Sequence, residues 1–208
     1  GLGTGLSFSY YGPAGHGVID IAVMRTLPEI SILNPSDPIS AAEAAKIACN
    51  KKGPTYVRLH KDPRRVIYGK DCKFNSNYNI VKNGEKFCII TSGLMTETAI
   101  KIYQYLKEYK IKVTVVDLFQ IKPINLKKFS NLLSKQKKIV TIEDNSIVGG
   151  IGSICSEIIT DHNLNVRLKK YAIKDEQTFK YGDPEWLLKQ YKMDYKSLRN
   201  SIKKYFIS

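Results

Sequence analysis

Long apolar runs are missing from this sequence of 208 residues. No stretch of about 18 apolar residues occurs, which excludes an ordinary membrane-spanning helix. Residues 1–6 lack the basic flank and the apolar core of a secretory signal peptide. They also lack a starting methionine, so we expect the sequence to be a fragment or a processed product. We predict no membrane partner.

Cysteine and histidine are scarce, with four and three residues. No two of the four cysteines form a Cys-x-x-Cys pair, and no histidine lies near them at ligand spacing; they are Cys49, Cys72, Cys88 and Cys155. We therefore predict no metal site in this chain. Cys49, Cys88 and Cys155 lie in apolar runs, so we expect them to pack as small hydrophobic residues. Unpaired cysteines favour a reducing compartment, and we predict a cytoplasmic protein.

Acidic residues are also few. The chain has 19 Asp and Glu against 33 Lys and Arg, which gives a net charge of +14. The positive excess is spread along the chain, and its densest clusters, residues 135–138 and 203–204, are short. Most lysines fit the polar faces of predicted helices. We therefore predict no nucleic-acid partner. The charge balance suits a phosphorylated or carboxylated small substrate instead.

The first part of the chain reads as a strand–helix–strand unit after an initial helix. A helical stripe runs from Val18 and ends at Pro28, and strands are predicted over residues 30–33 and 55–59. Between them, Ser36 or Asp37 caps a helix over residues 39–50. Two strands and two helices in about 60 residues cannot cover both faces of a sheet. The rest of this domain must come from upstream sequence or from another chain.

A second and larger α/β domain is predicted over residues 78–208, after a polar linker at residues 62–77. Its strands are almost continuously apolar, which is typical of a mostly parallel sheet covered on both faces. The predicted strands cover residues 87–91, 113–118, 139–143 and 166–172. The predicted helices cover residues 94–109, 126–133, 151–160 and two segments within 184–206.

Two glycine-containing segments are candidates either for binding the phosphates of a nucleotide or for forming a tight turn. Gly1, Gly3 and Gly5 form only a weak phosphate-loop pattern because no strand precedes them. The segment 149–152 contains three glycines before a helix, and a tight turn with close helix packing explains it better than a nucleotide fingerprint. Glu143 and Asp144 end the preceding strand, where they either cap that helix or bind a partner.

Two groups of residues are candidates for substrate binding. His16 follows a loop rich in glycine and tyrosine and precedes a helix, whose N-terminus favours anions. Arg58, His60 and Lys61 end a predicted parallel strand, where basic side chains suit a phosphate or a carboxylate. The plain alternatives are that His16 packs against a neighbouring tyrosine and that the strand end is only solvated.

The order of motifs resembles the transketolase family over nearly the whole chain. The family's Gly-Pro-Thr-His-Gln loop and following helix are similar to Tyr11-Gly12-Pro13-Ala14-Gly15-His16-Gly17 and the segment through Met24-Arg25 to Pro28. Its Pro-x-Asp turn and Gly-Pro strand are similar to Pro35-Ser36-Asp37 and Gly53-Pro54-Thr55-Tyr56-Val57-Arg58. Its acidic and glycine-rich C-terminal segment is similar to Glu143-Asp144-Asn145 and Gly149-Gly150-Ile151-Gly152-Ser153.

The resemblance implies part of a thiamine-diphosphate pyrimidine-binding domain over residues 1–61, followed by a complete transketolase C-terminal domain. It implies a cofactor of thiamine diphosphate with magnesium, bound between chains and mostly by residues that this chain does not contain. His16 would then be the catalytic residue and would contact substrate oxygens. Lys61 matches the family's phosphate-binding arginine, and Lys61 with Arg58 or Arg25 would face a substrate phosphate or stabilise the loop. The implied partners are a second copy of the chain, an N-terminal transketolase section, or both.

The resemblance further implies transfer of a two-carbon ketol unit between sugar phosphates or related sugars. Tyr11 replaces the family's acidic residue, which helps to read a sugar hydroxyl, so we expect an unusual sugar. Three alternatives share the fold. They are a deoxyxylulose-phosphate synthase, the beta chain of a 2-oxoacid dehydrogenase, and a noncatalytic structural or assembly module.

Overall fold

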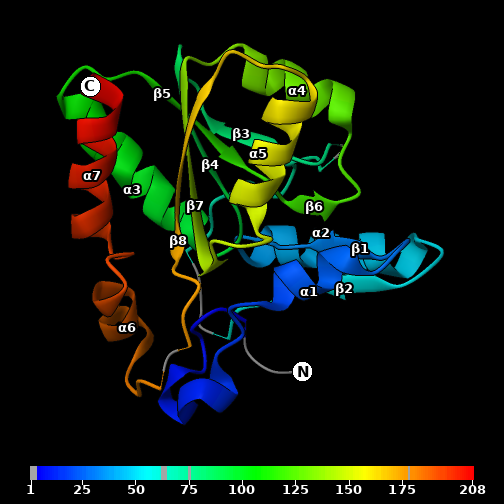
Figure 1. Ribbon diagram of the computed structural model, residues 1–208. Coiled ribbons are helices and arrows are strands. Elements are labelled where there is room, and N and C mark those ends of the chain that lie inside the picture. Colours follow the sequence, from blue (N-terminus) through cyan, green and yellow to red (C-terminus); the bar gives the residue numbers. More distant parts are fainter. Residues whose placement is uncertain (1–3, 62–64, 75, 178) are drawn as a thin grey trace.

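The computed structural model describes residues 4–61, 65–74, 76–177 and 179–208 (Figure 1). The elements of the first domain and of the junction are η1 (Ser9–Gly15), α1 (Asp20–Thr26), β1 (Ser31–Leu33), α2 (Pro38–Asn50) and β2 (Thr55–Val57). The strands that follow are β3 (Asn79–Lys82), β4 (Phe87–Thr91), β5 (Val113–Asp117), β6 (Gln120–Lys122), β7 (Lys138–Ser146) and β8 (Arg167–Ile173). The helices that follow are α3 (Met95–Glu108), α4 (Leu126–Ser134), α5 (Ile151–Asp161), α6 (Pro184–Gln190) and α7 (Tyr195–Ile207).

The larger domain is a three-layer α/β structure. Its five-stranded sheet has the order β3-β5-β4-β7-β8, in which β3 pairs antiparallel with β5 and the other pairs are parallel. Helices α3 and α7 cover one face of the sheet, and α4 and α5 cover the other (Figure 1). The prediction of a mostly parallel sheet is therefore confirmed.

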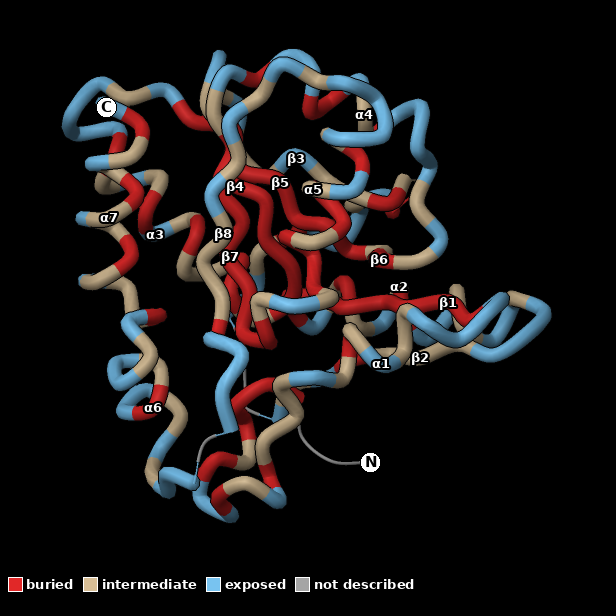
Figure 2. The backbone as a smooth tube through the Cα atoms, in the orientation of Figure 1, coloured by how far each residue is buried: buried red, intermediate tan, exposed pale blue. Residues whose placement is uncertain are grey.

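Burial on both faces explains why the central strands are apolar without alternation. On β4, Cys88 and Ile90 pack toward α4 and α5, whereas Ile89 packs toward α3 and α7. All three side chains are fully buried, and Figure 2 shows the buried strands as the centre of the domain. Because successive side chains of a strand point to opposite faces, a strand with a helix layer on each side needs apolar residues at every position.

The smaller sheet contains a strand that comes from beyond the first domain. Its order is β2-β1-β6, with β1 and β2 parallel and β6 antiparallel to β1. The sequence analysis predicted neither β6 nor β3. Strand β6 has three residues, of which only Ile121 is buried, and Pro123 follows directly, so no periodic pattern develops.

The start of α2 confirms the predicted cap. The Asp37 side chain accepts a hydrogen bond from the Ser40 N–H at 2.7 Å, and the Ser40 hydroxyl lies 2.9 Å from the Asp37 N–H. Pro38 occupies the first turn, where its missing N–H leaves no donor unsatisfied. The reciprocal bonds form a capping box that fixes where the helix begins.

The segment expected to be a polar linker packs as part of a core within its described residues. Tyr68 and Phe74 are 8% exposed and contact a cluster that includes Leu33, Ala44 and Phe119. The Tyr68 hydroxyl donates a hydrogen bond to Asp117 at 2.7 Å. Apolar residues scattered among prolines, glycines and asparagines account for the difference. Residues 62–64 and 75 of the expected linker lie outside the described residues.

The expectation that the cysteines pack as small hydrophobic residues is only partly correct. Cys88 and Cys155 are buried, but Cys49 is exposed near the end of α2, because its helix position faces solvent. Among the described residues, no helix is long and apolar enough to cross a membrane.

Candidate functional site at the junction of the two domains

Residues 4–17 form a closed loop beside the ends of the sheets. Gly5 and Gly17 exchange two backbone hydrogen bonds of 2.9 Å, and η1 lies between them. The Ser9 hydroxyl donates to the Gly182 carbonyl at 2.6 Å, and a side chain on Gly12 would collide with Tyr181. The loop therefore packs against the segment before α6, as the blue and orange elements at the bottom of Figure 1 show.

Arg58 does not lie at a solvated strand end, as the sequence analysis allowed, but is fully buried beneath this loop. Its Nε donates to Asp20 Oδ2 at 2.8 Å, and its Nη1 donates to Asp144 Oδ1 at 2.7 Å. Its Nη2 also lies 3.4 Å from the Gly17 carbonyl. Burial alone would lower the pKa of Arg58, but the two carboxylates outweigh it and raise the pKa. The guanidinium is thus committed to the protein's own carboxylates.

Asp144 joins the two domains on the other side of this ion pair. It is 1% exposed and lies in β7 of the larger sheet, near the end of that strand. Burial would raise its pKa, but the charges of Arg58 and His60 hold the pKa below its ordinary value. A Cβ on Gly5 would lie 2.0 Å from Asp144 Oδ2, so the backbone of the loop covers the carboxylate. Asp144 therefore binds Arg58 of the same chain.

His60 connects the loop to the first turn of α3. Its Nδ1 lies 3.1 Å from the Ser7 hydroxyl, 3.3 Å from the Thr4 hydroxyl and 3.8 Å from Asp144 Oδ2. Its Nε2 accepts a hydrogen bond from the Leu94 N–H at 3.3 Å. This bond places the proton of a neutral ring on Nδ1, toward the hydroxyls. His60 therefore fixes the position of the chain immediately before Lys61.

Glu143 caps α5, as predicted, and explains the glycines that follow it. Its carboxylate accepts hydrogen bonds from the N–H groups of Ile151 and Gly152 at 2.6 and 3.0 Å. A Cβ on Gly150 would lie 2.0 Å from the same carboxylate. Burial raises the pKa of Glu143 to about 7, although these hydrogen bonds and one from Asn145 oppose the rise. The turn-and-packing interpretation of the glycines is confirmed.

His16 lies directly after η1 with an unsatisfied ring. Both ring nitrogens are buried and have no hydrogen-bond partner among the described residues. Burial lowers the pKa of His16, and the Ser9 backbone near the ring opposes this only in part, so the imidazole is neutral near pH 7. Tyr10 and Tyr11, its expected packing partners, are 65% and 67% exposed. A neutral imidazole can donate one hydrogen bond and accept another, which suits a hydroxyl or a carbonyl.

Lys61 contacts Phe8 of the loop, and Phe8 packs on Gly15, which immediately precedes His16. The Lys61 ammonium lies 4.6 Å from the centroid of the Phe8 ring. The Phe8 carbonyl packs so closely on Gly15 that a Cβ there would lie 2.2 Å from it. The exposed lysine and the histidine thus adjoin one segment, although 45 residues separate them in sequence.

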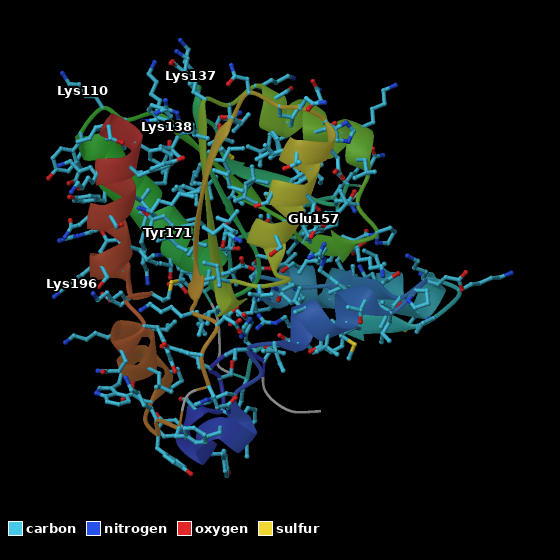
Figure 3. All side chains as sticks on the ribbon, in the orientation of Figure 1. Lys110, Lys137, Lys138, Glu157, Tyr171 and Lys196 are labelled. Atoms are coloured by element: carbon cyan, nitrogen blue, oxygen red, sulfur yellow. The ribbon has the colours of Figure 1, made fainter. Side chains whose placement is uncertain are left out.

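Arg25 is placed elsewhere, on the side of α1 that faces α5. Its guanidinium donates to the Gly149 carbonyl at 2.8 Å and forms an ion pair with Glu157 at 2.5 Å. Glu157 is labelled on α5 in Figure 3. A Cβ on Gly149 would lie 2.5 Å from the Ala22 side chain, so the two helices approach closely here. Like Arg58, Arg25 ties elements together.

Residues 2–65 match the family described as the transketolase pyrimidine-binding domain, and residues 76–198 match the transketolase C-terminal domain. The chain belongs to the transketolase family. It is 29% identical to one subunit of the apulose-4-phosphate transketolase of Actinobacillus succinogenes, over 95% of this chain and 64% of that protein. It is 29% identical to the 1-deoxy-D-xylulose-5-phosphate synthase of Caldanaerobacter subterraneus, over 92% of this chain and 31% of that protein.

The fold is also that of a transketolase. A solved structure described as "Split gene transketolase, inactive beta4 tetramer" superposes with a TM-score of 0.86 and 25% identity, covering 98% of this chain and 64% of that one. The chain therefore spans less than two thirds of the length of these relatives.

The described residues do not provide a cluster of metal ligands. No group of three or more His, Cys, Asp and Glu among them could hold a metal ion. The buried carboxylates are already occupied, since Glu143 holds the start of α5, Asp144 holds Arg58, and Asp117 accepts hydrogen bonds from Ser36 and Tyr68.

Proposed function

We propose that this chain is the C-terminal section of a thiamine-diphosphate-dependent transketolase that transfers a two-carbon ketol unit between sugars or sugar phosphates. The observation that carries the proposal is that both transketolase regions occur in order along the whole chain. Two relatives that the chain matches over 64% of their length are named as one subunit of a transketolase and as a split-gene transketolase. The cofactor, with its magnesium, is supplied by an N-terminal section, because the described residues provide no metal site.

Within this enzyme, His16 binds substrate oxygens and Lys61 binds a substrate phosphate. The unsatisfied neutral ring of His16 supports the first role, since a buried ring without partners gains hydrogen bonds when a hydroxylated ligand enters. The exposed ammonium of Lys61 supports the second, and a lysine binds phosphate as a point charge. Arg58 and Arg25 hold the loop and helix in place, and do not meet the substrate in this proposal.

Reconstitution tests the proposed activity. The full chain is mixed with an N-terminal transketolase section, thiamine diphosphate and magnesium, and ketol transfer from xylulose-type and fructose-type donors is measured. Transfer that requires both sections is expected. A stable complex of the two sections that transfers nothing from any donor would contradict the proposal and favour the noncatalytic module.

Two variants separate the roles of the site residues in the reconstituted enzyme. His16→Ala is expected to lower kcat/KM about ten- to a thousandfold. Lys61→Ala is expected to raise KM for phosphorylated donors and to leave unphosphorylated donors unchanged, because a remote phosphate is held equally in the ground and transition states. Lys112→Ala, which changes an exposed lysine paired with Glu85, is the control. Loss of thermal stability without a kinetic change would show that His16 only packs.

A second candidate activity is formation of 1-deoxy-D-xylulose 5-phosphate. The 29% identity to a synthase of that name favours it. The same reconstituted enzyme is assayed for this product in parallel with ketol transfer. Synthesis of this product without ketol transfer would replace the first proposal with the second. The beta chain of a 2-oxoacid dehydrogenase is a third alternative. An enzyme of that kind would form neither of the two products assayed.

We further assign an exposed aliphatic stripe on α1 to a contact between two copies of the chain, in a cytoplasmic homodimer. Ile19, Val23 and Leu27 follow one another at helical spacing and are 59%, 53% and 46% exposed. Val148 extends the stripe from the turn that α1 contacts through Gly149. Val23→Asp is expected to shift the full chain toward the monomer in sedimentation. A wild-type chain that is monomeric at micromolar concentration would contradict the assignment.

A further inference from the structure

A cleft of about 520 Å³ lies where α3, α6 and the start of α7 meet. Its volume falls within the range of small-molecule sites, about 300 to 1,000 Å³. Figure 1 places α6 below α7 and next to the loop that contains η1. None of the proposed substrate residues lines the cleft, so the proposed ketol transfer does not account for it.

The cleft presents an aromatic face above an apolar floor. Trp186 is 42% exposed and is the single tryptophan of the chain. Its ring is seated against Gly182, where a Cβ would lie 2.6 Å from the indole. Leu188 and the buried Met193 form apolar lining below it. An indole held in this way offers a rigid flat surface at little cost in conformational entropy.

Charged groups of both signs surround this surface in equal number. The lining contains three lysines and three carboxylates, which are Lys101, Lys189, Lys196, Asp183, Glu185 and Asp194. Lys196 is labelled at the lower end of α7 in Figure 3. The balance does not favour a strongly anionic or cationic ligand. It favours an uncharged ligand that both donates and accepts hydrogen bonds.

Several of these groups retain unused hydrogen-bonding capacity. Asp194 caps α7 through Oδ1, but its Oδ2 is buried without a partner among the described residues. Glu185, Lys189 and Lys196 form no ion pair within the described part of the chain, whereas Lys101 is held by Glu97 at 2.8 Å. The cleft therefore combines free donors and free acceptors beside an aromatic plane.

We propose that this cleft binds an uncharged sugar, with the C–H face of the ring on Trp186 and its hydroxyls on the surrounding lysines and carboxylates. A sugar ring has one apolar face and a rim of hydroxyls that donate and accept, and this matches both features of the cleft. The site is a second carbohydrate site, formed wholly by the C-terminal domain and independent of cofactor.

Intrinsic fluorescence of the full chain tests the proposal, because Trp186 is the sole tryptophan and reports on this cleft alone. Titration with D-glucose, D-xylose and maltose is expected to give a saturable change in emission for at least one of them, with Kd of about 1 mM. Absence of saturation for all three below ~20 mM would overturn the proposal. Saturation by sugar phosphates alone would overturn it in favour of an anion site.

Variants decide whether the signal comes from binding in the cleft. Glu185→Gln removes an exposed acceptor and is expected to weaken binding about fivefold, which is about 1 kcal/mol. Glu176→Gln, an exposed residue outside the lining, is the matched control and is expected to leave Kd unchanged. Equal weakening by both variants would contradict the assignment. Calorimetric titration of Trp186→Ala, with its unfolding midpoint checked, is expected to show no binding.

Discussion

Replacement of Arg58 by methionine distinguishes a buried structural arginine from a substrate-binding one. The substitution keeps most of the side-chain volume but removes the guanidinium from Asp20 and Asp144. Those carboxylates are 14% and 1% exposed, and Asp144 Oδ2 already has no hydrogen-bond partner among the described residues. Removing one partner of a buried ion pair costs about 3–5 kcal/mol, because the remaining charge is left uncompensated. We expect Arg58→Met to lower the free energy of unfolding by about this amount at pH 8.

The loss is expected to depend on pH in a defined direction. In the wild-type chain Arg58 keeps the pKa of Asp144 low, whereas in the variant burial dominates and raises it. A carboxyl with a raised pKa is protonated in the folded state at low pH, which removes the buried charge. The destabilisation is therefore smaller at pH 5 than at pH 8.

Urea unfolding of the full chain at both pH values measures this effect. The control is Lys101→Met, which breaks a surface pair with Glu97 and is expected to cost no more than about 0.5 kcal/mol. Arg58→Met with a loss below about 1 kcal/mol at pH 8 would refute the reasoning. Normal stability together with lost activity would restore the substrate-binding role that the sequence analysis gave to Arg58.

Three further predictions concern other parts of the chain. Burial raises the pKa of Glu143 to about 7, so the folded chain keeps a proton on Glu143 at pH values where the unfolded chain has released it. The free energy of unfolding should therefore fall by on the order of 3 kcal/mol between pH 4.5 and 7. Glu143→Gln should flatten this part of the pH profile measured by urea unfolding. Gly150→Ala should cost about 1–3 kcal/mol by displacing the Glu143 carboxylate, whereas Gly69→Ala, where a Cβ meets nothing within 4 Å, should be nearly neutral in thermal unfolding. A chain of residues 78–208 should unfold cooperatively by circular dichroism, and a noncooperative transition would contradict the predicted domain boundary.

The sequence predicted the larger domain well because its elements carry strong local signals. The run from Phe87 to Ile90 is apolar at every position. The spacing of Ala99, Ile102 and Leu106 indicates one face of a helix, and these three residues are fully buried. The predictions failed where pairing partners are distant. β6 is three residues long, and it exists as a strand because β1 lies beside it.

The candidate site was predicted less completely for a similar reason. His16 and Lys61 were predicted from loop composition and from the end of a strand, and their roles stay predictions. Nothing local to Arg58 indicates that Asp20, 38 residues upstream, and Asp144, 86 residues downstream, converge on it. Asp20 was missed altogether, since an acidic residue in the first turn of a helix usually serves the helix dipole. Only the tertiary structure shows that Arg25 and Arg58 form ion pairs that hold separate elements together.

The antiparallel pairing of β6 with β1 affects how this protein can exchange parts with its relatives. The two family regions meet between residues 65 and 76, which makes that interval the natural crossover point for recombination or for engineered chimeras. A donor C-terminal region joined there would bring its own β6 and lay it against the recipient's β1. The junction of such a chimera would join the two regions where they normally meet, but the donor's β6 would pair with a β1 of different sequence. Compatible swaps must therefore select these two short strands as a pair, although about 90 residues of chain separate them.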